Sequence, residues 1–231
     1  MGSGSVPRGA QLTPLWHPSP NCGPRRDGAV PDLVVLHYTA MDCAERARDW
    51  LCTPKAEVSA HYVVGADGTV WQLVDEADRA WHAGAGRWGP VTDVNSRSIG
   101  IEISNTGTTP FAAAQMDAVE ALLSGILARH RIPPDRVIGH SDMAPGRKID
   151  PGRRFDWQRL ARQGLSIWPT PEGDGSFTDN ARTFGYTADV PCEVILHSMR
   201  LRFRPGATGP LDSTDRALMA NLAQRWPVAA T

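Results

Sequence analysis

The sequence has few cysteines, almost no net charge and no long hydrophobic run, and each of these absences excludes a class of protein. No stretch of about 18 apolar residues is present, which excludes a membrane-spanning helix. The 24 Lys and Arg residues nearly balance the 25 Asp and Glu residues, leaving a formal net charge of −1. The chain as a whole therefore has no electrostatic attraction to nucleic acid. With 231 residues, it can bury a sizeable core without disulfide bonds.

The four cysteines show no Cys-x-x-Cys spacing, which argues against a zinc knuckle built on thiolates. Cys43 and Cys52 flank a short helical pattern, and whether they pair is open, because a helix between them would hold them apart. Residues 1–30 contain no apolar segment of the kind that a secretory signal needs. On the sequence as given we therefore expect a cytoplasmic location, with the periplasm or cell envelope as the alternative.

One stretch is locally basic, in spite of the overall balance of charge. Its residues are Arg147, Lys148, Arg153, Arg154, Arg159 and Arg162. No aromatic stacking pattern accompanies them, so we expect a solvated face or a contact with an anionic ligand rather than a nucleic-acid site.

The periodicity of apolar residues indicates interleaved strands and helices after an irregular arm at residues 1–30. The predicted strands cover 33–38, 60–64, 69–74, 98–103 and 136–139, and the predicted helices cover 43–51, 112–130 and 156–163. Interleaving of this kind predicts an α/β fold, in which a mixed central sheet is flanked by helices, over residues 31–168.

The composition changes at residues 169–178, where prolines and glycines indicate a linker. Beyond it, residues 179–231 are predicted to form a small helical module. One amphipathic segment covers 190–203, and a second helix is predicted to be capped by Ser213 or Thr214, with apolar residues recurring every four positions.

Two histidines lie where strands end. His37 ends the first long strand and His140 follows the last one. Strand ends in α/β sheets commonly carry functional groups, so these imidazoles can converge on one metal ion. Hydrolytic zinc sites take three His or carboxylate ligands and keep a position open for water. An aspartate from the loop after His140 would complete such a set, and the spacing does not choose between Asp142 and Asp150.

Glu102 is the candidate general base. In the strand over 98–103 three isoleucines share one face and Glu102 points to the other. A carboxylate in that position is suited to proton transfer as a general acid or base, and Lys148 is suited to stabilise negative charge. The alternative for Glu102 is a solvent-facing residue on an edge strand.

Several motifs together resemble a known family. Their sequences are Leu36-His37-Tyr38-Thr39, Ser59-Ala60-His61-Tyr62, Trp81-His82-Ala83-Gly84, Gly100-Ile101-Glu102 and Gly139-His140-Ser141-Asp142 continuing to Pro151-Gly152. In this order they are similar to the zinc-dependent N-acetylmuramoyl-L-alanine amidases of the type-2 amidase fold. That fold is shared with peptidoglycan recognition proteins and the phage lysozyme-type amidase. The resemblance covers residues 31–168. Residues 179–227 more weakly resemble a peptidoglycan-binding-like helical module.

The resemblance implies a role for each matched residue. His37, His140 and Asp150 match the Zn²⁺ ligands, which favours Asp150 over Asp142. Glu102 matches the acidic residue that acts on water, and Lys148 matches the lysine that steadies the oxyanion. The phage-type enzymes have a catalytic tyrosine where this chain has Ala60, so Glu102 carries more weight here.

Two further residues are predicted to contact substrate. His82 lies in a glycine-rich loop, where a packed structural histidine is the alternative, and Asn95 matches a substrate-contacting position of the cytoplasmic recycling subgroup. His61, in the middle of a strand, is expected to be structural.

The resemblance also implies an activity. The expected reaction is hydrolysis of the amide between N-acetylmuramic acid, or its 1,6-anhydro form, and L-alanine of the stem peptide, in peptidoglycan turnover or recycling. Peptidoglycan fragments or muropeptides are then the partners. The alternative is a non-catalytic module that binds muropeptide without cutting it. The presence of all three ligand positions together with Glu102 and Lys148 favours the enzyme.

Overall fold

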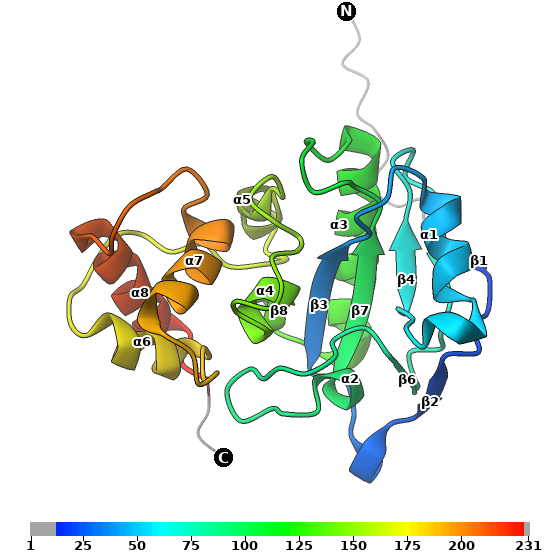
Figure 1. Cartoon of the computed structure of the whole chain (residues 1–231), viewed down its shortest axis with the longest axis horizontal. Helices are drawn as coiled ribbons and strands as arrows, with labels where there is room; N and C mark the ends of the chain where they lie inside the picture. Colours follow the sequence, from blue (N-terminus) through cyan, green and yellow to red (C-terminus); the bar gives the residue numbers. More distant parts are fainter. Residues whose placement is uncertain (1–12, 229–231) are drawn as a thin grey trace, which may run out of the picture.

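The computed structural model describes residues 13–228, and a six-stranded mixed sheet lies at its centre (Figure 1). In sheet order the strands are β1 (Leu15–Trp16), β5 (Val70–Gln72), β4 (Tyr62–Val64), β7 (Ser98–Ile103), β3 (Leu33–Tyr38) and β8 (Val137–Gly139). All neighbours are parallel except β4 and β5, which form a hairpin. The predicted mixed α/β sheet is confirmed.

Helices cover both faces of this sheet. The side chains of Ile99, Ile101 and Ile103 pack in one core with α3 (Ala113–His130) and α5 (Trp157–Arg162). On the opposite face α1 (Ala44–Leu51) packs over β4 and β5. The alternation along β7 predicted this division, and it leaves Glu102 on the face away from α3.

The predicted elements of the central domain are present, with ends that differ by at most two residues. Several other short elements were not predicted, because three or four residues outside an apolar run carry no measurable period. They are the 3₁₀ turns η1 (Arg26–Gly28), η2 (Pro54–Ala56) and η3 (Pro134–Arg136), the strand β6 (Asp78–Ala80), and the single-turn helices α2 (Val94–Arg97) and α4 (His140–Met143).

The N-terminal arm is more ordered than the sequence predicted. Residues 1–12 lie outside the described part of the chain, but from residue 13 onward the arm contains two short strands. β1 pairs with β5 at the edge of the central sheet, and β2 (Cys22–Pro24) pairs with β6. The prolines around them hid these strands, since proline is tolerated at sheet edges but weakens any strand prediction.

Three helices follow residue 176: α6 (Phe177–Phe184), α7 (Cys192–Phe203) and α8 (Ser213–Arg225). The N-cap of α8 is Asp212, whose carboxylate accepts from the Asp215 N–H, rather than Ser213 or Thr214. These helices lie beside the β8 edge of the sheet (Figure 1) and share a core with Leu33 and Ile138.

The structure also answers the question of Cys43 and Cys52. They stand at the two ends of α1, as its N-cap and C-cap. Nine residues of helical rise separate them by about 13 Å, roughly twice the Cα separation that a disulfide tolerates. All four cysteines are free.

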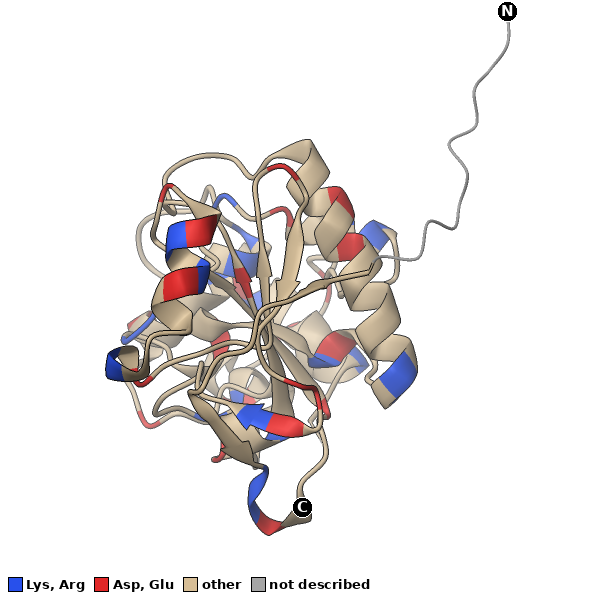
Figure 2. Cartoon of the chain, turned by 90° about the vertical axis from the view of Figure 1, so that its right-hand side faces the viewer, with Lys and Arg blue, Asp and Glu red and all other residues tan. Residues whose placement is uncertain are grey.

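Acidic and basic residues are interspersed along the ribbon in Figure 2, and α1 carries two acidic residues, Glu45 and Asp49, and two basic ones, Arg46 and Arg48. Within residues 13–228 no helix is both long enough and apolar enough to cross a bilayer.

Candidate metal centre and its cavity

His37, His140 and Asp150 converge at one end of the sheet. His37 lies near the end of β3, and His140 follows β8, which is parallel to β3 with Leu36 opposite Gly139. The loop after α4 then returns Asp150 to the same place. His37 Nδ1 and His140 Nδ1 are 2.9 Å apart, and each is 2.9 Å from Asp150 Oδ2. These three buried groups are able to hold a metal ion.

The outward hydrogen bond of His140 fixes its tautomer. His140 Nε2 lies 2.9 Å from the carbonyl oxygen of Ala83. A carbonyl only accepts, so Nε2 carries the proton and Nδ1 presents a lone pair toward Asp150. Arg147 donates to the same Ala83 oxygen at 2.7 Å, which holds that acceptor in place.

The tautomer of His37 follows from a chain of three groups. Ser98 Oγ donates its proton to the Val94 carbonyl at 2.6 Å, and therefore accepts from His82 Nε2, 3.1 Å away. His82 Nδ1 is then an acceptor, and it lies 3.0 Å from His37 Nε2. His37 consequently carries its proton on Nε2 and presents the Nδ1 lone pair to the centre.

The donor set fits a divalent cation. Two imidazole lone pairs and a carboxylate oxygen face one another at hydrogen-bond distance with no proton left to share. Burial, together with the nearby His140, lowers the pKa of His37 to about 4, so it is neutral near pH 7. Burial alone would raise the pKa of Asp150, but the contacts with His140 and His37 outweigh it and lower that pKa. Neutral imidazole and ionised carboxylate are the forms that bind zinc.

Asp142, the other candidate aspartate, points away from this centre. One carboxylate oxygen accepts from the Gly139 N–H at 2.8 Å and from Arg202 at 2.9 Å, and the other accepts from the Tyr186 hydroxyl. Asp142 therefore stabilises the turn that begins at His140 and is not a member of the cluster that could hold a metal ion.

A cavity of about 560 Å³ opens over His37, His140 and Asp150, which we call the metal-binding cluster. Its walls include Glu102 and Lys148 beside the cluster, and the exposed apolar side chains of Trp50, Val58 and Ile149 toward solvent. The sequence-predicted catalytic and metal-binding residues thus share one cavity. The apolar rim is suited to packing against the non-polar face of a substrate.

Glu102 stands beside His37 in the sheet. The two residues are paired in the register of β7 and β3, so their side chains leave the same face. Glu102 Oε2 is buried without a hydrogen-bond partner among the described residues. Burial, reinforced by the charge of Asp150 and opposed by Lys148, raises the pKa of Glu102 well above its ordinary value. A carboxyl group with a raised pKa can both accept and return a proton near neutral pH.

His82 lies beneath His37, where both of its ring nitrogens have partners within the protein, although it also lines the cavity. Its position requires Gly100, because a Cβ there would lie 2.4 Å from His82 Cγ. Asn95 lies behind the site and does not line the cavity. Its side-chain oxygen accepts from the backbone N–H groups of His82 (3.1 Å) and Ala83 (2.8 Å).

Some supporting residues were not identified from the sequence. Arg25, from the N-terminal arm, donates to the carbonyls of Ser96 (2.8 Å) and Ser98 (3.1 Å), and so braces the start of β7. Its other partners are further backbone oxygens and His61 Nε2 (3.2 Å), all far away in the sequence, so no local motif marks Arg25. His61 is buried; its Nδ1 accepts from the Gly100 N–H, and it has the structural role that was expected.

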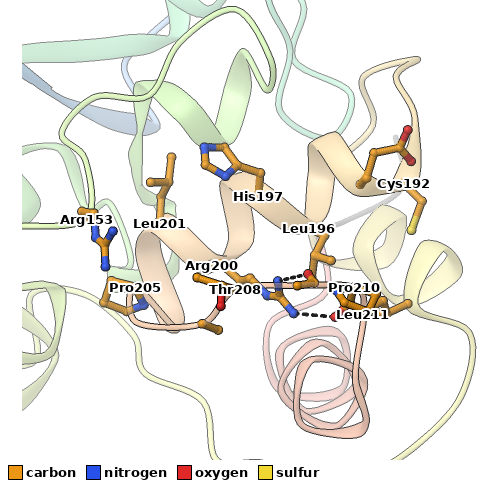
Figure 3. A pocket seen from close by; sticks show the side chains of 13 residues that line it. Arg153, Cys192, Leu196, His197, Arg200, Leu201, Pro205, Thr208, Pro210 and Leu211 are labelled. Carbon is orange, nitrogen blue, oxygen red and sulfur yellow. Dashed lines mark hydrogen bonds between the residues drawn. The ribbon is translucent and has the colours of Figure 1, made fainter.

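A second cavity, of about 540 Å³, lies between α7 and the segment 204–211 (Figure 3). Arg200 on its wall donates to the carbonyls of Gly209 and Pro210 and pairs with Asp215. Because these hydrogen bonds and this ion pair all lie within the helical segment 177–225, Arg200 stabilises that segment. No titratable group of the metal-binding cluster lines this cavity.

The comparisons with known proteins agree with this site. Residues 27–153 match the N-acetylmuramoyl-L-alanine amidase family (Amidase_2). The N-acetylmuramoyl-L-alanine amidase AmiD of Escherichia coli is 34% identical, over 84% of this chain and 83% of that protein. The 1,6-anhydro-N-acetylmuramyl-L-alanine amidase AmpD of Enterobacter cloacae is 35% identical, over 62% of this chain and 86% of its own length.

Solved structures of amidases are also similar to this chain. E. coli AmiD in complex with the substrate anhydro-N-acetylmuramic acid-L-Ala-D-gamma-Glu-L-Lys superposes with a TM-score of 0.77 at 30% identity, covering 95% of this chain and 93% of AmiD. AmpDh3 from Pseudomonas aeruginosa, in complex with anhydromuramic pentapeptide, gives 0.77 at 27% identity, covering 97% and 99%. The chain belongs to the N-acetylmuramoyl-L-alanine amidase family.

Proposed function

We propose that the chain is a zinc-dependent amidase of peptidoglycan turnover or recycling. Its substrate is a muropeptide, and the bond that it cleaves is the amide between N-acetylmuramic acid, or the 1,6-anhydro form, and L-alanine of the stem peptide. The names of the similar proteins support this substrate.

One observation carries the proposal. His37 Nδ1, His140 Nδ1 and Asp150 Oδ2 stand 2.9 Å from one another, and the outward hydrogen bonds leave all three as acceptors. The lone pairs of these three acceptor atoms repel one another at this distance unless a cation lies between them. Two imidazoles and one carboxylate, at the base of an open cavity, are a typical zinc hydrolase set. These three residues would hold the ion.

The other residues of the cavity supply the rest of the chemistry. A zinc ion bound there would act as a Lewis acid, polarising the scissile carbonyl and making water more acidic. Glu102 accepts a proton from the attacking water and returns it to the leaving nitrogen of L-alanine. The Lys148 ammonium stabilises the negative charge that develops on the carbonyl oxygen.

His82 and Asn95 have supporting roles in this proposal. His82 orients His37, and Asn95 holds the backbone at residues 82–83, where the Ala83 carbonyl orients His140. Contact of either residue with substrate stays a prediction.

The organisation of the chain is also a proposal. We infer a catalytic domain at 31–168, a linker at 169–178 and a small helical module at 179–231. The position of α6 to α8 after this linker supports the division, although α6 already begins at Phe177.

The test is mass spectrometry of the products from a purified muropeptide, with and without a chelator. The proposal predicts release of a stem peptide that begins with L-alanine, loss of this product with chelator, and recovery when zinc is added. Muropeptides with the 1,6-anhydro sugar and with ordinary N-acetylmuramic acid are assayed in parallel. Faster cleavage of the anhydro form would indicate a role in recycling of peptidoglycan fragments. Zinc binding without cleavage would reject the enzyme in favour of a module that only binds muropeptide.

A further inference from the structure

Two buried polar side chains of the C-terminal helical segment, residues 177–225, contact the turn that carries His140. Arg202 of α7 is 1% exposed, and Tyr186, which follows α6, is also 1% exposed. Both reach Asp142, a residue of the turn that begins at His140. The side chains lie 60 and 44 residues away from Asp142 in the sequence, so the contact joins the two parts of the chain.

Arg202 contacts the chain on both sides of His140. Its guanidinium donates to Asp142 Oδ2 at 2.9 Å, after His140, and to the Val137 carbonyl at 2.8 Å, before it. The same group stacks 4.4 Å from the centre of the Trp157 ring. A planar guanidinium held by two acceptors and an aromatic face has one orientation.

Asp142 transmits this constraint to the metal ligand. The oxygen that accepts from Arg202 also accepts from the Gly139 N–H, immediately before His140. The turn α4 has only four residues, so a shift of Asp142 moves the backbone of His140 with it. An unpaired carboxylate cannot stay at this buried position, because burial of an isolated charge is costly.

We propose that the C-terminal helical segment is a built-in part of the metal centre, in which Arg202, assisted by Tyr186, positions His140 through Asp142. The inference rests on the proposed function in one respect, namely that His140 binds the metal. According to this inference, the C-terminal helical segment contributes to catalysis by holding His140 in place, and it does not need to bind a ligand itself to do so. Arg202 and Tyr186 are positioning residues, since neither lines the cavity over the metal-binding cluster.

Arg200 provides a matched control on the same helix. It is also buried, at 7% exposure, and also pairs with a buried aspartate, Asp215. Its partners all lie within the helical segment. Arg200→Met and Arg202→Met therefore remove the same kind of ion pair from α7, and only the second one touches the turn of His140.

The experiment measures zinc affinity of the full chain by competition with a chromophoric chelator, and the absorption spectrum of the Co²⁺-loaded protein. Arg202→Met is expected to weaken zinc binding about 10- to 100-fold, as for other groups that orient metal ligands, and to shift the Co²⁺ bands. Tyr186→Phe should weaken it less, and Arg202→Lys, which keeps the charge, should recover part of the loss. Arg200→Met should bind zinc as the wild type does.

Two results would overturn the inference: wild-type zinc affinity in Arg202→Met, or an equal loss in Arg200→Met. If Arg202→Met does not fold, Tyr186→Phe and Arg202→Lys decide, and wild-type affinity and spectrum in both would reject it. A wild-type chain that binds no zinc would instead reject the proposed function, and this inference with it. The two failures are thus distinguished by the wild-type titration.

Discussion

His37 on β3 and Glu102 on β7 are paired in the register of two parallel strands. This pairing places a metal-facing imidazole and a buried carboxyl group side by side on one face of the sheet. This register in two central strands sets the separation of the two side chains, so in the proposed mechanism Glu102 would transfer a proton at a fixed distance from His37. Catalytic precision of this kind is better supported by strands than by loops.

Glu102→Gln should abolish proton transfer while preserving the shape of the site. We expect kcat to fall about 10²- to 10⁴-fold, with zinc affinity within a few-fold of the wild type, because Glu102 is not one of the clustered ligands. Peptide release from a muropeptide and chelator competition measure the two quantities. Full activity in Glu102→Gln would show that another group transfers the proton.

His82→Ala should weaken zinc binding about 10- to 100-fold, because His37 loses the acceptor that fixes its tautomer. Ser98→Ala, which removes the next group in the chain, should have a smaller effect in the same direction. His197→Ala, at an exposed histidine of α7, is the control and should bind zinc normally. Equal affinities in all three variants would contradict the orientation of His37 by His82.

Gly100→Ala should destabilise the protein and weaken zinc binding together. The added Cβ would lie 2.4 Å from His82 Cγ, so the ring must move. Overpacking of this kind costs about 1–3 kcal/mol in free energy of unfolding. Gly206→Ala is the control, because nothing lies within 4 Å of its added Cβ. Urea unfolding and chelator competition report both effects, and an unchanged zinc affinity in Gly100→Ala would speak against a fixed His82.

Glu76, which does not line the cavity over His37, His140 and Asp150, should make stability depend on pH in the acid range. Burial raises its pKa, but hydrogen bonds from Arg129, Tyr62 and His130 outweigh this and lower the pKa from 4.5 to about 2. A lowered pKa in the folded state stabilises the protein above the unfolded value of 4.5, and the contribution disappears as the pH falls toward 2.

Glu76→Gln should therefore lose about 2 kcal/mol in free energy of unfolding at pH 7, and the difference from the wild type should shrink between pH 4.5 and 2. Urea unfolding at a series of pH values measures this. Asp117→Asn is the control, since Asp117 is 71% exposed and its ion pair contributes little. A difference that stayed constant with pH would exclude ionised Glu76 as its source.

Much of the site was predictable because its residues lie on strongly periodic strands or in a well-defined loop. The alternation along β7 placed Glu102 opposite three isoleucines, and the strand ends placed His37 and His140 together. Asp150 came from the family resemblance, since spacing did not distinguish it from Asp142.

The supporting contacts could not be predicted from the sequence. Arg25 binds backbone carbonyls, which every residue has, and Arg202 meets Asp142 across 60 residues. The sequence around each arginine contains no motif that indicates these partners. The same holds for His82: its glycine-rich loop is compatible with contact to substrate, and only the fold shows its position beneath His37.

One zinc ion is proposed to join His37, His140 and Asp150. The decisive measurement is anomalous X-ray scattering at the zinc absorption edge, from crystals of the zinc-loaded chain. We expect one anomalous peak in contact with His37 Nδ1, His140 Nδ1 and an Asp150 carboxylate oxygen. No peak at these atoms, or a peak only at other residues, would contradict it.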